Sequence, residues 1–146
     1  MARVHDPIPG IHERLTPRID RIFHNLRVDT PVQRFNWSIQ RDSALFAWPE
    51  DHTESIDPAT SLFYRVERQT LTRLPTSGAL AFTIRVHMDP LESLLAHPGA
   101  MTALFSAIDA TPEALKQYKT FDWLAPALDK YRTMANRVDA PGVSSA

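Results

Sequence analysis

The segment 62–88 constrains the fold of this chain more than any other part of the sequence. Apolar and polar residues alternate along 79–88 with the period of two that is typical of a β-strand. The preceding stretch, 62–74, is predicted to be another long strand. Between them, Pro75-Thr-Ser-Gly78 supplies residues that favour a turn. The sequence therefore predicts a long β-hairpin.

Each strand of the predicted hairpin has two chemically distinct faces. The second strand presents one apolar set, Leu80, Phe82, Ile84, Val86 and Met88, and one mixed set, Ala81, Thr83, Arg85 and His87. The first strand presents Tyr64, Val66, Arg68, Thr70 and Thr72 on one side and Arg65, Glu67, Gln69, Leu71 and Arg73 on the other. A change of one residue in the turn exchanges the faces. The sequence alone leaves open which face of one strand combines with which face of the other.

Weaker patterns place the remaining elements. They are a helix over 11–27, a strand over 32–40, a surface loop over 49–61 and helices between 101 and 131. Pro17 either kinks the first helix or begins it, with Thr16 as N-cap. Thr111 is predicted to cap a short second helix, with Pro112 in its first turn.

The order helix, strand, hairpin, helices predicts an α+β fold with an antiparallel sheet of about three strands. We expect residues 1–137 to form one domain and residues 138–146 to be a disordered tail. Three strands make a thin sheet for a complete domain.

Composition excludes several classes of protein. The 146-residue chain is 43% hydrophobic and 23% charged, with a net charge of −1, so it lacks the basic excess of a nucleic-acid-binding domain. Because it has no cysteine, it cannot itself form disulfides, thiolate-ligated haem, iron–sulfur or zinc–thiolate sites. No apolar run approaches the roughly 20 residues of a membrane span, and the N-terminus does not resemble a signal peptide. We therefore expect a cytoplasmic protein.

Long polar side chains are unusually dense on the hairpin: Arg65, Glu67, Arg68, Gln69, Arg73, Arg85 and His87. One interpretation is a solvated sheet surface with glutamate–arginine pairs across the strands. The other is a site for an anion, because the planar guanidinium group matches carboxylates and phosphates.

Histidine spacing gives no support to a zinc hydrolase, because none of the six histidines pairs at the close spacing of a zinc motif. A single neutral imidazole can ligate haem iron without a second motif. His5 and His87 are the two candidates for a functional role. Nucleophile-elbow, phosphate-loop and dinucleotide fingerprints are absent from the sequence.

Five segments together resemble the haem-dependent oxidative N-demethylase family, α subunit. They occur in the family's order and at similar spacing, and they span roughly residues 3 to 132. They are Val4-His5-Asp6-Pro7-Ile8-Pro9-Gly10, Val32-Gln33-Arg34-Phe35-Asn36-Trp37, Arg65 to Gly78, Phe82-Thr83-Ile84-Arg85 with Pro90-Leu91, and Tyr118-Lys119. The arginine-rich segment from Arg65 to Gly78 is the longest and most specific of them.

This resemblance implies a PAS-like fold that binds haem. It also implies a monooxygenase-type activity in amine metabolism: removal of a methyl group from a small secondary amine such as dimethylamine, with oxygen as co-substrate. The electrons would come from a separate flavin and iron–sulfur reductase subunit.

The resemblance also suggests roles for individual residues. His5 is the candidate axial ligand of the haem iron, with an ordinary loop histidine as the alternative. Arg65, Arg68 and Arg85 are candidates for cofactor binding, Arg68 and Arg85 either through the haem propionates or by polarising bound oxygen. The candidate catalytic residues are Glu67, Arg68 and His87.

Two of these positions leave alternatives open. Glu67 would either neutralise an ammonium substrate or pair with an arginine. His87 stands where the family commonly has an aromatic residue such as tyrosine.

Length separates this chain from the family that it resembles. Family members are longer, with an N-terminal half before the segment that contains His5. We therefore expect the first strands of the PAS-like sheet to be missing here, and another chain to supply them if the enzyme is complete. The alternatives are a non-catalytic PAS-like ligand-binding or sensor module, and an inactive fragment of a split gene.

Overall fold

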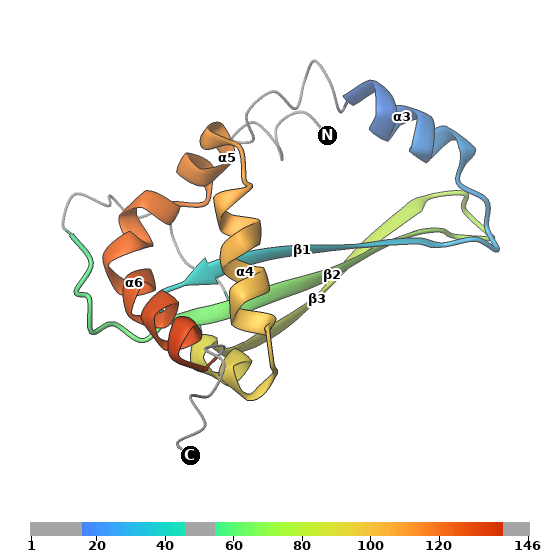
Figure 1. Cartoon of the computed structure of the whole chain (residues 1–146). Helices are drawn as coiled ribbons and strands as arrows, with labels where there is room; N and C mark the ends of the chain where they lie inside the picture. Colours follow the sequence, from blue (N-terminus) through green and yellow to red (C-terminus); the bar gives the residue numbers. More distant parts are fainter. Residues whose placement is uncertain (1–15, 46–54, 139–146) are drawn as a thin grey trace. The chain divides into compact units, whose positions relative to one another are not determined.

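The computed structural model describes residues 16–45 and 55–138. The elements in chain order are α3 (Thr16–Asn25), β1 (Val32–Gln40), β2 (Phe63–Arg73), β3 (Leu80–Pro90), η1 (Leu91–Ala96), α4 (Ala100–Asp109), α5 (Glu113–Tyr118) and α6 (Phe121–Val138) (Figure 1). This order confirms the predicted α+β class. The short 3₁₀-helix η1 was not predicted. The N-terminal part of the predicted first helix, the start of the predicted loop and the tail from 139 lie outside the described residues.

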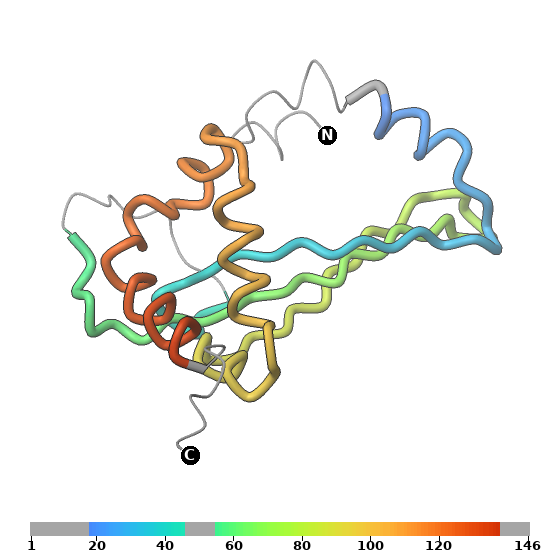
Figure 2. Tube along the Cα trace, in the orientation of Figure 1, coloured from blue at the N-terminus to red at the C-terminus, as the bar shows by residue number. Residues whose placement is uncertain are grey.

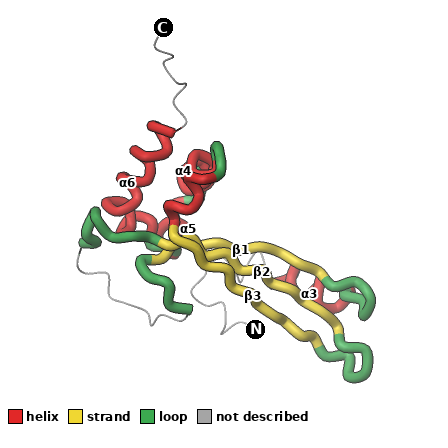
Figure 3. The backbone as a smooth tube through the Cα atoms, turned by 90° about the horizontal axis from the view of Figure 1, so that it is seen from below, coloured by secondary structure: helices red, strands yellow, loops and turns green. Residues whose placement is uncertain are grey.

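The three strands form one antiparallel sheet in the order β1-β2-β3 (Figure 3). The strand predicted over 32–40 is confirmed, as is the long hairpin of β2 and β3. Figure 2 follows the chain from β2 through the turn into β3. Gly78 has a φ of +69° and its amide donates to the Leu74 carbonyl over 3.0 Å. Glycine adopts this left-handed conformation without the steric penalty of a side chain, and so closes the hairpin.

Backbone hydrogen bonds at the two ends of the hairpin fix the register of β2 and β3. The Leu74 amide donates to Ala79 over 2.8 Å at the turn, and the Leu91 amide donates to Leu62 over 2.7 Å at the open end. The two strands have equal numbers of residues between these bonds, so a single register runs from end to end. In that register residue 68 faces residue 85, and residue 66 faces residue 87. The apolar set of β3 therefore shares a face with Arg65, Glu67, Gln69, Leu71 and Arg73 of β2.

The chain divides into two compact units, residues 39–64 with 88–146 and residues 1–38 with 65–87. The first of these holds nearly all of the described core: Ile39, Ile56, Leu62, Leu91, Met101, Leu104, Phe105, Ile108, Phe121, Leu124, Ala127, Leu128, Tyr131 and Ala135. The members of this core that lie on α4 and α6 recur at helical spacing, and the two helices pack against each other. Tyr131 is fully buried, and its hydroxyl accepts a 3.1 Å hydrogen bond from the Leu62 amide.

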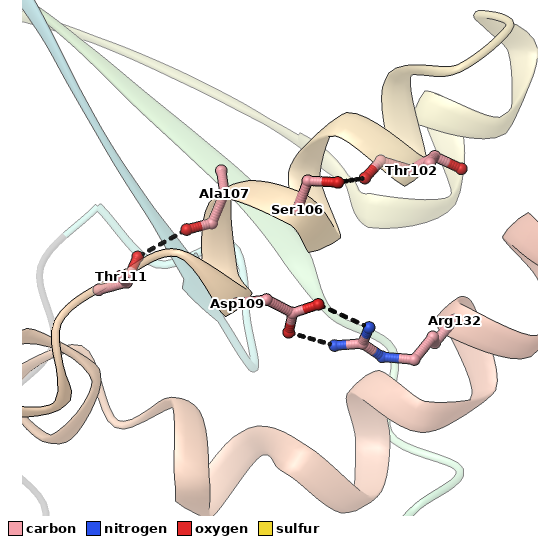
Figure 4. Close-up of polar contacts among 6 residues, drawn as sticks. All are labelled: Thr102, Ser106, Ala107, Asp109, Thr111 and Arg132. Atoms are coloured by element: carbon pink, nitrogen blue, oxygen red, sulfur yellow. Dashed lines mark hydrogen bonds and ion pairs between the residues drawn. The ribbon is translucent and has the colours of Figure 1, made fainter.

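In this unit, which we call the helical unit, polar contacts join α4 to α6 and follow the end of α4 (Figure 4). Arg132 of α6 donates to both carboxylate oxygens of Asp109 over 3.0 and 2.8 Å, which lowers the pKa of Asp109. Thr111 was wrongly predicted to cap α5, because its hydroxyl donates back to the Ala107 carbonyl of α4 over 2.7 Å. The N-cap position of α5 is Pro112, which makes no side-chain capping bond.

The other unit, which we call the sheet unit, has a thin core. Its buried residues within 18–38 and 65–87 are Leu26, Gln69 and Leu71. Arg73 of β2 holds the end of α3 in place: its guanidinium donates to the Phe23 carbonyl, to the Leu26 carbonyl over 2.7 Å and to the Gly78 carbonyl over 2.8 Å. A cation at the C-terminus of a helix also interacts favourably with the negative end of the helix dipole.

Candidate functional site

The sheet unit presents two faces of different chemistry. Arg34 of β1 donates to the Gln69 side chain over 2.6 Å, and Asn36 hydrogen-bonds to Glu67. Even-numbered residues of β1 therefore share a face with odd-numbered residues of β2. We call this side the carboxylate face; its members are Arg34, Asn36, Arg65, Glu67, Gln69, Leu71, Phe82, Ile84 and Val86. We call the opposite side the aromatic–basic face; its members are Gln33, Phe35, Trp37, Val66, Arg68, Thr70, Thr83, Arg85 and His87.

A closed polar network occupies the carboxylate face. Arg65 forms an ion pair with Glu67 in which Nη2 and Oε1 are 2.9 Å apart, and the Gln69 amide donates to the other carboxylate oxygen over 2.9 Å. The Arg65 and Glu67 side chains are only 15% and 19% exposed. Gln69 is buried and links this pair to Arg34. Every polar group named here has a partner within the network.

The network sets the charge state of Glu67. Burial alone raises the pKa of this carboxyl group, but hydrogen bonds from Gln69 and Arg65, the Arg65 charge and a hydrogen bond from Asn36 outweigh it. The pKa of Glu67 is lowered as a result, so the group is a carboxylate at neutral pH. Pairing with an arginine was one of the two predicted roles of Glu67, and the structure shows that pairing.

The aromatic–basic face brings two arginines together. Arg68 lies directly across the strand pair from Arg85, and both side chains are exposed. Neither forms an ion pair or a hydrogen bond with another described residue. Like charges that face each other across an antiparallel pair destabilise it. His87 is the next residue of β3 on this face, and it is also exposed.

Aromatic side chains of β1 lie on the same face as these cations. The pairs Arg34–Gln69 and Asn36–Glu67 fit one antiparallel register, which sets Phe35 alongside Arg68 and Trp37 alongside Val66. Phe35 is 63% exposed, although it is a large apolar residue on a strand. Rings beside guanidinium groups that have no ion-pair partner among the described residues suit a planar ligand that carries carboxylates, because the rings stack and the guanidinium fork binds each carboxylate through two hydrogen bonds.

The predicted site residues are thus divided between the two faces. Arg68, Arg85 and His87 come together on the aromatic–basic face, whereas Arg65 and Glu67 lie on the carboxylate face. His5 lies outside the described residues. Sequence reasoning did not connect Phe35 and Trp37 with the arginines, because the connection depends on the pairing of β1 with β2. It likewise did not anticipate the buried Gln69 at the centre of the network.

Within 16–45 and 55–138, no three histidine, aspartate or glutamate side chains gather as a metal site would require. Over the same ranges, no helix combines the length and the apolar character needed to cross a membrane.

The residues of the aromatic–basic face lie within a range that matches a known protein family. The family model described as haem-dependent oxidative N-demethylase, alpha subunit-like, matches residues 1–128. The matched range includes all three strands and therefore every residue of both faces. The chain belongs to the family of proteins like the alpha subunit of haem-dependent oxidative N-demethylase.

Proposed function

We propose that this chain acts as a haem-binding subunit in the oxygen-dependent removal of a methyl group from a small secondary amine such as dimethylamine. The family match over residues 1–128 is the observation that carries the proposal. The family description includes haem dependence and oxidative N-demethylation. The aromatic–basic face adds support, since its side chains suit such a cofactor.

The two faces of the sheet unit differ in how well their side chains suit haem. Haem is a flat apolar macrocycle with carboxylates, and it needs aromatic or apolar contacts together with cations. The aromatic–basic face offers both, through Phe35, Arg68 and Arg85. The carboxylate face fits poorly, because Arg65 is already paired with Glu67 and the carboxylate of Glu67 would repel a propionate.

One histidine of the chain is proposed to ligate the haem iron. His5 is the candidate axial ligand, on the basis of the family resemblance around it, and a neutral imidazole suits ferric or ferrous haem. When bound, haem supplies the oxygen activation that oxidative demethylation needs. The chain's own residues would bind and orient: Arg68 and Arg85 would hold anionic groups, and the exposed His87 imidazole on the same face would contact the same ligand.

Glu67 has a different place in this proposal. Its carboxylate is held on the carboxylate face by Arg65, Gln69 and Asn36. It would therefore maintain the polar network on the opposite side of the sheet from Arg68 and would not contact the same ligand. Electrons would come from a separate reductase with flavin and iron–sulfur centres. Because this chain has no cysteine, a thiolate-bound cluster would belong to that partner.

Haem titration of the purified full chain tests the proposal. We expect a Soret band whose position and intensity change in His5→Ala but not in His24→Ala, a control at an exposed histidine of α3. With reductant, oxygen and dimethylamine, the loaded protein should release formaldehyde. Absence of any haem uptake would contradict the proposed function. Haem uptake without formaldehyde, in the presence of a competent reductase, would favour a sensor or binding module.

A further inference from the structure

The facing arginines of the hairpin carry an inference that rests on the proposed function and deepens it. We infer that Arg68 and Arg85 form a clamp for two carboxylates, and that the aromatic–basic face is the side of the sheet that contacts the porphyrin. The juxtaposition of the two cations follows from the register of β2 and β3. The sequence alone could not place them on one face.

Spacing supports the clamp. Residues 68 and 85 belong to the hydrogen-bonded class of facing pairs, as do 62 with 91 and 74 with 79. The Cα atoms of such pairs lie about 5.5 Å apart. Two guanidinium groups that start this close can each reach one of two neighbouring carboxylates. Each arginine can bind its carboxylate through two parallel hydrogen bonds.

Other arginines of the sheet unit's strands are already engaged. Arg34 donates to Gln69, Arg65 is paired with Glu67, and Arg73 donates to backbone carbonyls. Arg68 and Arg85 have no such partner among the described residues, and both are exposed to a ligand. A purely structural role does not explain them, because facing like charges cost stability.

A binding role for Arg85 and a structural role predict opposite effects of its substitution on stability and on porphyrin binding. Arg85→Gln should leave the ligand-free chain as stable as the wild type or more stable, since it removes the repulsion from Arg68. The same substitution should weaken the binding of a dicarboxylate porphyrin. A structural arginine would show the opposite pattern: loss of stability and no specific loss of binding. Arg65→Gln on the carboxylate face is the matched control.

The decisive experiment uses two iron-free porphyrins, so that no axial bond contributes to affinity. The full chain is titrated with protoporphyrin IX and with its dimethyl ester, which lacks free carboxylates. We expect the wild type to bind the acid about tenfold or more tightly than the ester, from charged hydrogen bonds that the ester cannot make. Arg68→Gln and Arg85→Gln should lose most of this preference, and Arg65→Gln should keep it.

Other outcomes separate the clamp from the proposed function. Equal wild-type affinity for acid and ester, or an equal loss of preference in Arg65→Gln and Arg85→Gln, overturns the clamp but leaves haem binding intact. Failure of the wild type to bind either porphyrin or haem overturns both. A thermal melt of each variant checks that the fold is retained.

Discussion

Replacing Arg73 by methionine tests how the sheet unit is held together. The substitution keeps an unbranched apolar stem but removes every donor of the guanidinium group. Lost with it are the bonds to the Phe23 and Leu26 carbonyls at the end of α3, and an exposed bond to Gly78. Hydrogen bonds from charged donors contribute about 1.5–3 kcal/mol each. Counting only the two part-buried bonds, and allowing for partial replacement by water, we expect a loss of about 3 kcal/mol in the free energy of unfolding.

Equilibrium unfolding in urea, followed by circular dichroism, measures this loss. The control is Arg68→Met on the same strand, which should change stability by less than about 0.5 kcal/mol or increase it slightly. Hydrogen exchange should accelerate at the amides of α3 in Arg73→Met alone, because that helix end has lost its anchor. A cost below about 1 kcal/mol for Arg73→Met, or equal effects of the two substitutions, would refute the reasoning.

Three further predictions concern the polar network and the core. Glu67→Gln should destabilise the chain by about 2 kcal/mol in a thermal melt, and its effect should be less than additive with Arg65→Gln because the two residues form one ion pair. Because the folded-state pKa of Glu67 is lowered, its stabilisation is present above its ordinary value of 4.5 and is lost as the pH falls through the lower folded value. The wild type should therefore lose its advantage over Glu67→Gln in acid; a constant difference down to pH 2 would contradict this. Tyr131→Phe should cost about 1–3 kcal/mol in urea unfolding, because it leaves the buried Leu62 amide without an acceptor, whereas Tyr118→Phe at an exposed site should cost nothing measurable.

The strands could be predicted from the sequence because their signal is local and repeated. Alternation along 79–88 and along 32–40 extends over enough residues to distinguish a strand from a helix. The turn residues between β2 and β3 mark the hairpin but fit more than one loop length. The register depends on which amide closes the loop, and in the structure that is the amide of Gly78.

The candidate site was harder to predict, because neighbours in sequence lie on opposite faces of a strand. Arg68 and Glu67 are adjacent, yet one belongs to the aromatic–basic face and the other to the carboxylate face. Only the pairing with β1 and β3 shows which arginines have partners. Arg73 carried no local signal for its role, since the Phe23 and Leu26 carbonyls at the end of α3, which accept its two part-buried hydrogen bonds, lie far away in the sequence.

Nuclear magnetic resonance of the full chain with ferric haem distinguishes the two faces most directly. Paramagnetic iron broadens the signals of nearby methyl groups, with an effect that falls steeply with distance. Val66 and Thr83 lie on the aromatic–basic face, and Leu71 and Ile84 lie on the carboxylate face. We predict that the methyl signals of Val66 and Thr83 broaden strongly while those of Leu71 and Ile84 stay narrow. Broadening of Leu71 and Ile84 with sharp signals from Val66 and Thr83 would contradict the placement of haem on the aromatic–basic face.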